Sequence, residues 1–509
     1  MRSLALALAL ALALAVCVAV ALAALGGCSR DHEPSSADVP AHASPKLVVL
    51  ISIDTLRADH LGLHGHTRFT SPVLDAFAAQ GSVFEDASTP APWTLPAHAS
   101  MLTGHNPLGH GVVTPRTAFA DDIPTLASML AEVGFATAAV VNSTWLKQKT
   151  FGLTRDFDAF LAVDDADYGR RTPSTWVTDQ AMDWVRELGD ERLFLFMHYY
   201  DVHADYASLP AYETLFLTPY EGPADGTGWQ LQTANFDERH IQYCTLSFDP
   251  AVCAFGSSEK PRVIDAKTRR VRFDADDVRH LEELYDAGIR QLDTELGRFF
   301  SFLDEVGLGD TALVIVTSDH GEEFMEHGRV EHFLTTYQEM LHVPLILRGP
   351  GIPVGQRVDK PVSLVDIVPT VLSLVGAPLP DGIDGLDLSP LLSGGDASAF
   401  LQRPLYGEAA GGEGHAPPLD SIYPVYRSVR LGSLKLIQNS MQGTSALYDL
   451  ETDPREQRDV GSSQPEVAAR LGALLTARFA DFEARSRDPE AVELDPAERD
   501  RLRALGYLP

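Results

Sequence analysis

Four short runs of apolar residues are spaced along the first two thirds of the chain. Each run is rich in Val, Ile, Leu, Phe or Ala and ends in a polar residue. They are KLVVLISID at 46–54, GFATAAVVN at 134–142, RLFLFMHYY at 192–200 and TALVIVTSD at 311–319. Continuous apolar runs of this length are typical of parallel strands that are buried on both faces. The pattern therefore predicts the central strands of one buried sheet.

Segments with apolar residues at helical spacing separate these runs. They are SPVLDAFAAQ at 71–80, IPTLASMLAEVG at 123–134, TDQAMDWVRELG at 178–189 and a long segment at 276–307. Strands that alternate with helices predict an α/β fold, in which helices cover both faces of a doubly wound sheet. Ligands bind such sheets beyond the carboxyl ends of the strands. Asp54, His198 and Asp319 fall at or near three of these ends and are expected to lie close together.

The remaining sequence divides the chain into further parts. Residues 29–46 are polar and rich in Pro and Ser, which predicts a tether, and residues 47–395 form the main domain. The alternation of strands and helices stops at about 205–275, where we expect an insertion over the ligand-binding face. Residues 396–460 contain LKLIQN and SALYDL, which predict short antiparallel strands of a small C-terminal α+β subdomain, followed by a helical tail at 461–509.

The first 28 residues predict a bacterial lipoprotein signal peptide. Arg2 precedes a run of Ala, Leu and Val that ends in LGGC, which resembles a lipobox with Cys28 as the lipid-modified residue. The run is also long enough for a retained transmembrane helix, but the two glycines before Cys28 favour cleavage. Ser29 stands where an Asp retains many lipoproteins at the inner membrane. We therefore expect an outer-membrane anchor in the bacterial cell envelope, with the protein facing the periplasm.

Charge and cysteine content exclude one class of partner and leave one question open. Lys and Arg total 40 against 71 Asp and Glu, a formal net charge of -31, which argues against a surface that binds nucleic acid. With Cys17 in the leader and Cys28 at its end, Cys244 and Cys253 remain in the folded body. These two either form a disulfide in an oxidising compartment or stay free as buried thiols.

Three separated segments combine acidic, hydroxyl and histidine residues. They are LVVLISIDTLRADHLGLHGH at 47–66, TLPAHASMLTG at 94–104 and ALVIVTSDHGEEFMEHG at 312–328. In this order they resemble the sulfatase branch of the alkaline phosphatase superfamily, and ALYDLETDPREQRDV at 446–460 resembles the strand and turn that close the C-terminal subdomain of that family. The resemblance implies an alkaline phosphatase-like fold and a metal-dependent hydrolase of sulfate, phosphate or phosphonate esters.

By this resemblance, Thr94 stands where a sulfatase carries the cysteine that is converted to formylglycine, so no formylglycine is expected. An alcohol is a poor nucleophile at neutral pH, and coordination to a cation would lower its pKa and align it for attack. The alternative is a plain threonine that caps the helix at 94–104. His98 replaces the arginine that the family carries four positions after the nucleophile, and a titratable imidazole there predicts anion binding that weakens as the pH rises.

The resemblance also implies a metal site. Asp54, Asp319 and His320 correspond to ligands of one divalent cation, and the hydroxyl of Thr94 would complete the set. Many sulfatases carry a second Asp where this chain has Thr55, and Asn where it has His320. The ligand set is closer to that of phosphonate monoester hydrolases and phosphoethanolamine transferases. With fewer carboxylates and an imidazole, the expected ion shifts from calcium towards manganese or zinc.

Further polar residues near the same strand ends are candidates for contacts with the substrate. His203, in the segment HYYDVHADY, is the expected general acid for the leaving oxygen, a role that requires a near-neutral pKa within hydrogen-bond reach. His198, Asp201, His327 and His332 are candidates for substrate contacts or for a second metal ion. The competing interpretation is structural, because a lone histidine in an aromatic strand is more often a core residue.

Three functions remain open on this basis. The first is a hydrolase in which Thr94 attacks a small-molecule, glycan or lipid ester and water cleaves the Thr-linked intermediate. Because a threonine ester has no geminal hydroxyl with which to expel sulfate, this route favours phosphorus esters. The second is a phosphoethanolamine-type transferase that acts on the cell envelope, although that family carries several membrane helices before its catalytic domain. The third is a non-catalytic binding protein with a sulfatase fold.

Overall fold

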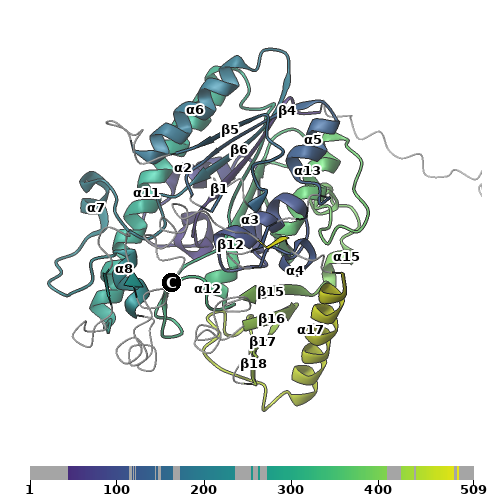
Figure 1. The fold of residues 1–509 in the computed structure, drawn as a ribbon. Helices are drawn as coiled ribbons and strands as arrows, with labels where there is room; N and C mark the ends of the chain where they lie inside the picture. Colours follow the sequence, from purple (N-terminus) through teal and green to yellow (C-terminus); the bar gives the residue numbers. More distant parts are fainter. Residues whose placement is uncertain are drawn as a thin grey trace, which may run out of the picture. The chain divides into compact units, whose positions relative to one another are not determined.

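One mixed sheet forms the centre of the protein (Figure 1). The computed structural model describes residues 44–113, 117–118, 120, 122–143, 145–146, 151–163, 172–234, 254–255, 262–263, 272–409, 426–440, 443–485 and 490–491. The strands of the sheet are β1 (Leu47–Ile53), β2 (Ser82–Ser88), β4 (Phe135–Val141), β5 (Ala159–Ala162), β6 (Arg192–Tyr199), β9 (Leu313–Ser318), β12 (His342–Arg348), β13 (Gln356–Val358) and β14 (Val362–Ser363). Their order is β13-β2-β12-β9-β1-β6-β4-β5, and β14 also pairs with β2.

The four predicted apolar runs form the middle of this sheet. β1 pairs in parallel with β6 and β9, and β4 pairs in parallel with β6. In β1, Val48 and Leu50 belong to one hydrophobic cluster, whereas Leu47, Val49 and Ile51 belong to another. Successive side chains of a strand point to opposite faces, so both faces of this sheet are covered.

Helices provide the cover on each face (Figure 1). α2 (Pro72–Ala78), α6 (Pro173–Glu187) and α11 (Ala275–Glu305) contribute to the cluster on one face. α3 (Thr94–Thr103), α5 (Leu126–Glu132) and α13 (Ile367–Val375) contribute to the cluster on the other. The predicted α/β fold with helices on both faces is thereby confirmed.

In the described part of the chain, five further strands complete the sheet, and two of them, β2 and β12, lie next to the predicted strands or to each other without a continuous apolar run. β2 carries Glu85 and Asp86, and β12 carries Pro344, which is why neither sequence stands out. β12 runs antiparallel to β9 and β2, and its register with β2 shifts between Val343 and Leu345, the position of the proline. Proline cannot donate a ladder hydrogen bond and is tolerated where the pairing bulges. The sheet is therefore mixed and not wholly parallel.

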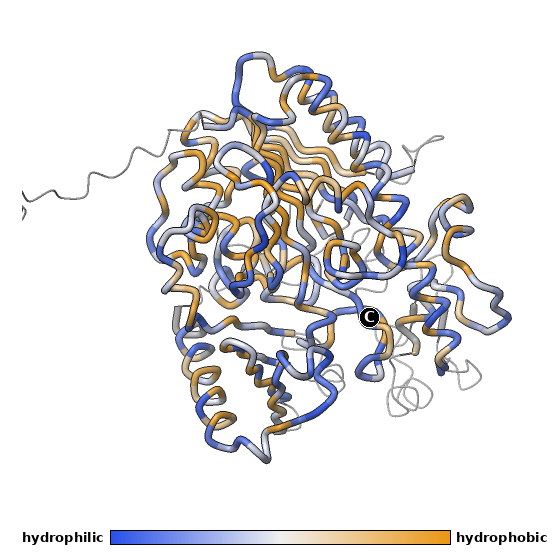
Figure 2. Tube along the Cα trace, turned by 180° about the vertical axis from the view of Figure 1, so that it is seen from behind, coloured by the Kyte–Doolittle hydropathy of each residue, from blue (hydrophilic) through white to orange (hydrophobic). Residues whose placement is uncertain are grey.

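A second, smaller sheet forms the C-terminal subdomain, as predicted. Its strands are β15 (Leu405–Ala409), β16 (Tyr426–Leu431), β17 (Leu434–Asn439) and β18 (Thr444–Asp449), which pair antiparallel in chain order. α17 (Pro465–Arg485) packs on this sheet through Leu471 and Leu475, which belong to the same hydrophobic cluster as Leu436. Figure 2 shows apolar residues concentrated in the central sheet, whereas polar and apolar residues alternate along α17.

The remaining elements are short. They are η1 (Ala58–His60), η2 (Gly62–His64), α4 (Pro107–His110), β3 (Thr117–Ala118), α7 (Pro210–Phe216), α8 (Gly228–Ala234), β7 (Ala254–Phe255), β8 (Arg262–Val263), β10 (Glu323–Phe324), β11 (Val330–Glu331), α12 (Gln338–Leu341), η4 (Leu364–Asp366), α14 (Ser389–Ser393), α15 (Ser398–Leu401) and β19 (Glu490–Ala491). α7, α8, β7 and β8 fall within the insertion expected at about 205–275.

Several predictions concern residues outside the described ranges. These are the leader with Cys28, most of the tether, and the pair Cys244 and Cys253. In the part of the chain that the structure describes, no helix has the length and apolar character needed to cross a membrane. The lipid anchor and the disulfide therefore stay predictions.

Candidate active site

Three strand ends and the start of one helix bring the predicted site residues together. Asp54 follows β1 directly, His198 lies near the end of β6, and Asp319 and His320 follow β9. Thr94 begins α3. The parallel register of β1 with β6 and with β9 aligns these strand ends at one edge of the sheet. This is the edge at which α/β sheets bind ligands.

Thr94 is the first residue of α3 and not the residue that caps it. The N-cap is Trp93, which makes no side-chain capping hydrogen bond, and the helix ends at Gly104 with a φ of 72°. The Thr94 hydroxyl is buried, and among the described residues its Oγ1 has no hydrogen-bond partner. It lies beside the Asp54 carboxyl and acts to lower the pKa of that group. The capping alternative is therefore excluded, and the hydroxyl points into the site.

Asp54, Asp319 and His320 form a buried cluster whose ligand atoms all lie within 4.8 Å of one another. His320 Nε2 lies 3.6 Å from Asp54 Oδ1 and 3.4 Å from Asp319 Oδ2. An overlapping group combines Asp319 with His98 and His198. The residues assigned to the cation by resemblance are thus close enough to share one ion.

The cluster contains several unsatisfied polar atoms. Within the described ranges, both carboxylate oxygens of Asp54, Oδ2 of Asp319 and Nε2 of His320 lack a hydrogen-bond partner, as does Thr94 Oγ1. Such a buried atom destabilises a fold by roughly 1–3 kcal/mol, and two neighbouring carboxylates also repel each other. A divalent cation with oxygen and imidazole ligands would satisfy these atoms together. The donor set therefore fits a metal ion.

Backbone contacts fix the direction of these ligands. The N–H groups of Thr55 and His320 donate to Asp319 Oδ1 at 3.2 and 2.9 Å. His320 Nδ1 donates to the Gly321 carbonyl at 2.9 Å, which leaves Nε2 with its lone pair towards the carboxylates. The Tyr285 hydroxyl of α11 donates to the Thr55 carbonyl at 2.7 Å and so fixes the turn after Asp54. The ligands are held in place by the fold itself.

Burial sets the charge of the same groups. Burial raises the pKa of Asp54 well above its ordinary value, and the charge of Glu322 adds to the rise. Burial also raises the pKa of Asp319, with the charge of Asp54 as the second cause. Burial lowers the pKa of His320, so its imidazole stays neutral and can coordinate a metal. A cation would favour the ionised carboxylates that burial opposes.

His98 has a different place from the one expected for an anion-binding residue. Its Nδ1 donates to the Thr94 carbonyl at 2.8 Å, and its Nε2 lies 2.9 Å from the Ser52 hydroxyl. Burial and the neighbouring His198 lower the pKa of His98 well below its ordinary range. Both ring nitrogens are therefore engaged within the protein, and the ring is neutral. The geometry assigns His98 to holding α3 against β1, which does not support the expected pH-dependent anion binding.

The structure separates His198 from Asp201. His198 Nε2 lies 3.3 Å from Asp54 Oδ2, and burial lowers the pKa of this histidine to about 3. Asp201 accepts a 3.1 Å hydrogen bond from Gln291 of α11. His198 therefore belongs to the cluster, whereas Asp201 contacts the helix that covers the sheet.

His203 and His332 lie together beside the cluster, although the sequence separates them widely. Their ring centres are 4.8 Å apart, and the rings of His332 and His320 are 4.6 Å apart. His203 Nε2 lies 3.2 Å from the Tyr200 hydroxyl. His332 Nδ1 lies 3.1 Å from Glu322 Oε1. Sequence reasoning missed Glu322, which is fully buried, and its signal was a carboxylate three residues after Asp319 in the same motif.

His327 lies apart from these histidines. Its Nδ1 contacts Glu339 Oε1 at 2.5 Å, and its Nε2 donates to the Glu456 carbonyl at 3.1 Å. The ring also stacks on Tyr337, with the ring centres 3.5 Å apart. His327 therefore contacts the C-terminal subdomain, and the structure does not bring it to the expected second metal site.

Another histidine and carboxylate group lies beside α11. The ligand atoms of His60, His66 and Asp286 lie within 4.8 Å of one another. Asp286 accepts from His60 Nδ1 at 2.7 Å, from His66 Nε2 at 3.1 Å and from Arg68 Nη1 at 2.7 Å. The guanidinium already supplies positive charge to this carboxylate. We interpret the group as an anchor between α11 and the segment after β1.

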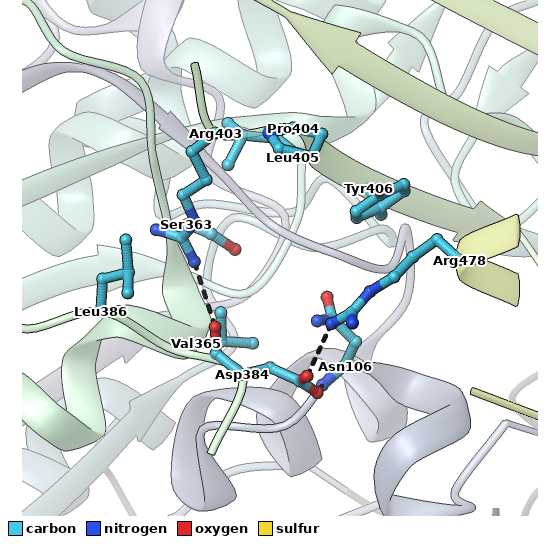
Figure 3. A pocket seen from close by; sticks show the side chains of 10 residues that line it. All are labelled: Asn106, Ser363, Val365, Asp384, Leu386, Arg403, Pro404, Leu405, Tyr406 and Arg478. Atoms are coloured by element: carbon cyan, nitrogen blue, oxygen red, sulfur yellow. Dashed lines mark hydrogen bonds and ion pairs between the residues drawn. The ribbon is translucent and has the colours of Figure 1, made fainter. Parts of the chain in front are cut away.

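A hollow of about 250 Å³ lies beyond the other end of α3 (Figure 3). Two arginines line it, and each is paired with a carboxylate. Arg403 Nη1 lies 2.6 Å from Asp366 Oδ2, and Arg478 Nη2 lies 2.6 Å from Asp384 Oδ1. Because both guanidinium groups are neutralised, the hollow lacks the features of an anion site. The candidate site lies at the Thr94 end of the helix.

Two family models match the chain. A model described as Sulfatase matches residues 46–377, and a model described as N-sulphoglucosamine sulphohydrolase, C-terminal, matches residues 326–482. Arylsulfatase K of Danio rerio is 26% identical over 456 residues, which cover 86% of this chain and 84% of the relative. Arylsulfatase of Clostridium perfringens is 24% identical over 480 residues, which cover 86% of this chain and 94% of the relative.

Solved structures share the same fold. The phosphonate monoester hydrolase of Silicibacter pomeroyi has a TM-score of 0.65 and 21% identity, with 87% of this chain and 96% of the other chain covered. A protein in complex with its substrate D-glucosamine-2-N,6-O-disulfate has a TM-score of 0.68 and 18% identity, with 88% of this chain and 99% of the other chain covered. At these identities the likeness establishes the architecture.

Proposed function

Because this chain belongs to the sulfatase family and is an ester hydrolase, we propose that it cleaves phosphate diesters or phosphonate monoesters with Thr94 as the nucleophile. Asp54, Asp319 and His320 would hold one divalent cation, manganese or zinc by their ligand type. The observation that carries the proposal is the buried, unpaired Thr94 hydroxyl beside unpaired carboxylates, within the residues that the structure describes. Family membership also disfavours the non-catalytic alternative.

Each residue has a defined task in this proposal. A bound divalent cation supplies positive charge, which lowers the pKa of a coordinated alcohol and offsets the negative charge of the ester. Free amides at the start of a helix such as α3 would favour a tetrahedral anion. Thr94 Oγ1 then gives up its proton to a neutral histidine and forms a bond to phosphorus while the bond to the leaving oxygen breaks. Water attacks the same phosphorus in the second step and regenerates the Thr94 hydroxyl.

The leaving oxygen needs a proton, and two histidines are placed to supply it. His203 is the candidate from the sequence, but its Nε2 contacts the Tyr200 hydroxyl. His332 is oriented through Nδ1 by the buried Glu322, which directs its Nε2 away from that carboxylate. Burial lowers the pKa of His332 to about 3, so its ring is neutral and begins as a proton acceptor. We therefore favour His332 as the group that takes the proton of Thr94 and passes it to the leaving oxygen. In the second step it would carry the proton of the attacking water back to Thr94. His203 lies beside it as a substrate contact.

Phosphorus esters are favoured over sulfate esters for a chemical reason. Formylglycine hydrate releases sulfate through its second hydroxyl, and Thr94 has no such group. Release from threonine therefore requires a second displacement at the central atom, which phosphorus supports well. Two relatives in the structural comparison, the phosphonate monoester hydrolases of Silicibacter pomeroyi and Agrobacterium radiobacter, are named for phosphorus chemistry.

The place of action is a further part of the proposal. The LGGC sequence that ends at Cys28 supports a lipid-anchored enzyme of the bacterial envelope, in contact with periplasmic glycan or lipid esters. A transferase that passes the phosphoryl group from Thr94 to an envelope acceptor would use the same residues. An assay in which the envelope acceptor competes with water for the phosphoryl group distinguishes the transferase from the hydrolase.

The test uses residues 29–509, which contain the whole compact unit from Ser44 onwards. The metal-stripped protein is assayed with bis-p-nitrophenyl phosphate, p-nitrophenyl phenylphosphonate and p-nitrophenyl sulfate, with Mn²⁺, Zn²⁺ or Ca²⁺ added. We expect the phosphorus esters to react fastest, and Thr94→Ala to lose activity by about 10⁴-fold or more. Thr94→Ser, which keeps a hydroxyl, is the matched control. Full turnover by Thr94→Ala would exclude this residue as the nucleophile.

A further inference from the structure

The hairpin formed by β10 and β11 carries the proposed acid and its partner. Glu322 precedes β10, and His332 follows β11. The two strands pair antiparallel through Glu323 with Glu331 and Phe324 with Val330. The position of His332 relative to the cluster therefore depends on how this hairpin is held.

Backbone conformations show that outside contacts hold the hairpin. Met325, Glu331 and Phe333 have φ values of 69°, 71° and 96°, in the left-handed region that favours glycine. A residue with a side chain is unfavourable there and keeps the conformation only where its surroundings enforce it. The hairpin and the residue that follows it therefore need partners elsewhere in the fold.

One partner comes from the segment that follows Asp54. Arg57 Nη1 donates to the Glu322 carbonyl at 2.9 Å and contacts Glu326 Oε1 at 2.5 Å. Burial acts to lower the pKa of Arg57, but the negative charges of Asp59 and Glu326 have the larger effect and raise this pKa. The metal-ligand segment and the base of the hairpin are thereby tied together.

The other partner is the C-terminal subdomain. At the tip of the hairpin, His327 contacts the carboxylate of Glu339 and the carbonyl of Glu456. Both partners are acceptors, which favours the doubly protonated form of the ring. Burial acts to lower the pKa of His327, but the hydrogen bond and negative charge of Glu339 outweigh the effect of burial and raise this pKa. Gln457 also donates to the Glu326 carbonyl at 3.3 Å.

Glu456 is itself held in a buried ion pair. It lies at the end of the Asp-Pro-x-Glu turn, with a φ of 53° and 1% exposure. Its Oε1 lies 2.9 Å from Lys435 Nζ, and its Oε2 accepts from the Gln338 N–H at 2.6 Å. Lys435, in β17, is also 1% exposed and donates to the Gln338 side chain at 3.0 Å. An ion pair buried this fully fixes the geometry of the turn, since neither charge tolerates the loss of its partner.

We propose that Glu456 and Lys435 are positioning residues, through which the C-terminal subdomain sets the hairpin and thereby aims His332 at the Thr94 site. This role rests on the function proposed above. In this role, the turn of the ALYDLETDPREQRDV motif positions the active site in addition to closing the subdomain.

The test compares Glu456→Gln with Glu451→Gln, an exposed glutamate of the same turn. The double variant Lys435→Met/Glu456→Gln removes both charges and serves where the single variant folds poorly. Aryl esters with p-nitrophenol and with phenol as leaving groups are assayed with each protein. A misplaced general acid harms the ester with the poorer leaving group more, so we expect kcat/KM for the phenyl ester to fall about tenfold more than for the p-nitrophenyl ester. Glu451→Gln should match the wild type on both.

A purely structural role predicts a different result. If the folded variants lose activity equally on both esters, or lose none, the positioning role is overturned. Hydrogen exchange gives a readout that needs no substrate, because we expect amides of residues 323–333 to exchange faster in the Glu456 variants only. If the wild type cleaves no ester, the proposed function fails and exchange alone decides. Faster exchange confined to the hairpin then supports the link to the subdomain, and unchanged exchange overturns it.

Discussion

The Nδ1 atom of His98 donates a 2.8 Å hydrogen bond to the carbonyl oxygen of Thr94. The Nε2 atom of the same ring lies 2.9 Å from the hydroxyl of Ser52 in β1. The imidazole thus joins the start of α3 to β1, the strand that directly precedes Asp54. Thr94 presents its hydroxyl to the site, whereas His98 determines where that hydroxyl lies.

Replacement of His98 by alanine should therefore reduce stability and turnover together. The change leaves the Ser52 hydroxyl and the Thr94 carbonyl buried without partners, which we expect to lower the free energy of unfolding by about 2–4 kcal/mol. kcat should fall because Thr94 moves, while KM changes by less than about threefold. Urea unfolding and Michaelis kinetics measure both effects. A large rise in KM at unchanged stability would instead indicate that His98 binds the anionic ester.

Metal affinity should rise with pH. Burial raises the folded-state pKa of Asp54 and Asp319, so the folded protein without metal binds more protons than the unfolded chain. The stability that these groups contribute is full below the ordinary Asp pKa, about 3.9, and declines as the pH rises towards the folded value. A cation replaces those protons. Added Mn²⁺ should raise the calorimetric midpoint more at about pH 7.5 than at about pH 5, and an equal gain would contradict a site built on these carboxyls.

Asp54→Asn should stabilise the metal-free protein while it abolishes activity. The amide keeps the shape of the side chain but removes one of two neighbouring buried carboxyls, which we expect to add about 1 kcal/mol to the free energy of unfolding without metal. Metal-dependent turnover should fall by about 100-fold or more. Asp190→Asn, at a fully exposed position, is the matched control. Lower stability of the Asp54 variant in chelator would show that the carboxylate has a structural partner instead.

Lys435→Met should be among the more destabilising single changes in the C-terminal subdomain. It leaves the Glu456 carboxylate buried without its counter-charge, for which we expect a loss of about 3–5 kcal/mol. The double variant with Glu456→Gln should lose less than the single one, because no buried charge remains unpaired. Lys46→Met, from an exposed pair, should change stability by less than about 1 kcal/mol. Denaturant midpoints of these proteins and of the Glu456→Gln single variant check the order, and additive losses of the two single changes would argue against a coupled pair.

Several site residues could be predicted from the sequence because they stand at the ends of apolar runs. A run such as TALVIVTSD predicts both a buried strand and the edge at which Asp319 and His320 emerge, and the order of the motifs predicts that Asp54 and Thr94 join them. The first inference needs only local periodicity and topology, whereas the second needs the resemblance to the sulfatase family. β12 was not predicted, because Pro344 interrupts its apolar pattern and because it pairs with strands that are far away in the sequence.

The sequence by itself determined the α/β fold and the small C-terminal subdomain, since both follow from spacing along the chain. The residues expected to converge on Thr94 were implied by the resemblance of three motifs to the sulfatase family. The tertiary structure alone decided what each side chain faces. His327 and His332 are five positions apart, yet one contacts Glu456 and the other contacts Glu322 at the site. No sequence pattern predicted the hydrogen bonds of the two His98 ring nitrogens or the buried ion pair of Lys435 with Glu456. The physical reason is that hydrogen-bond direction and burial depend on packing between distant segments, which no local pattern encodes.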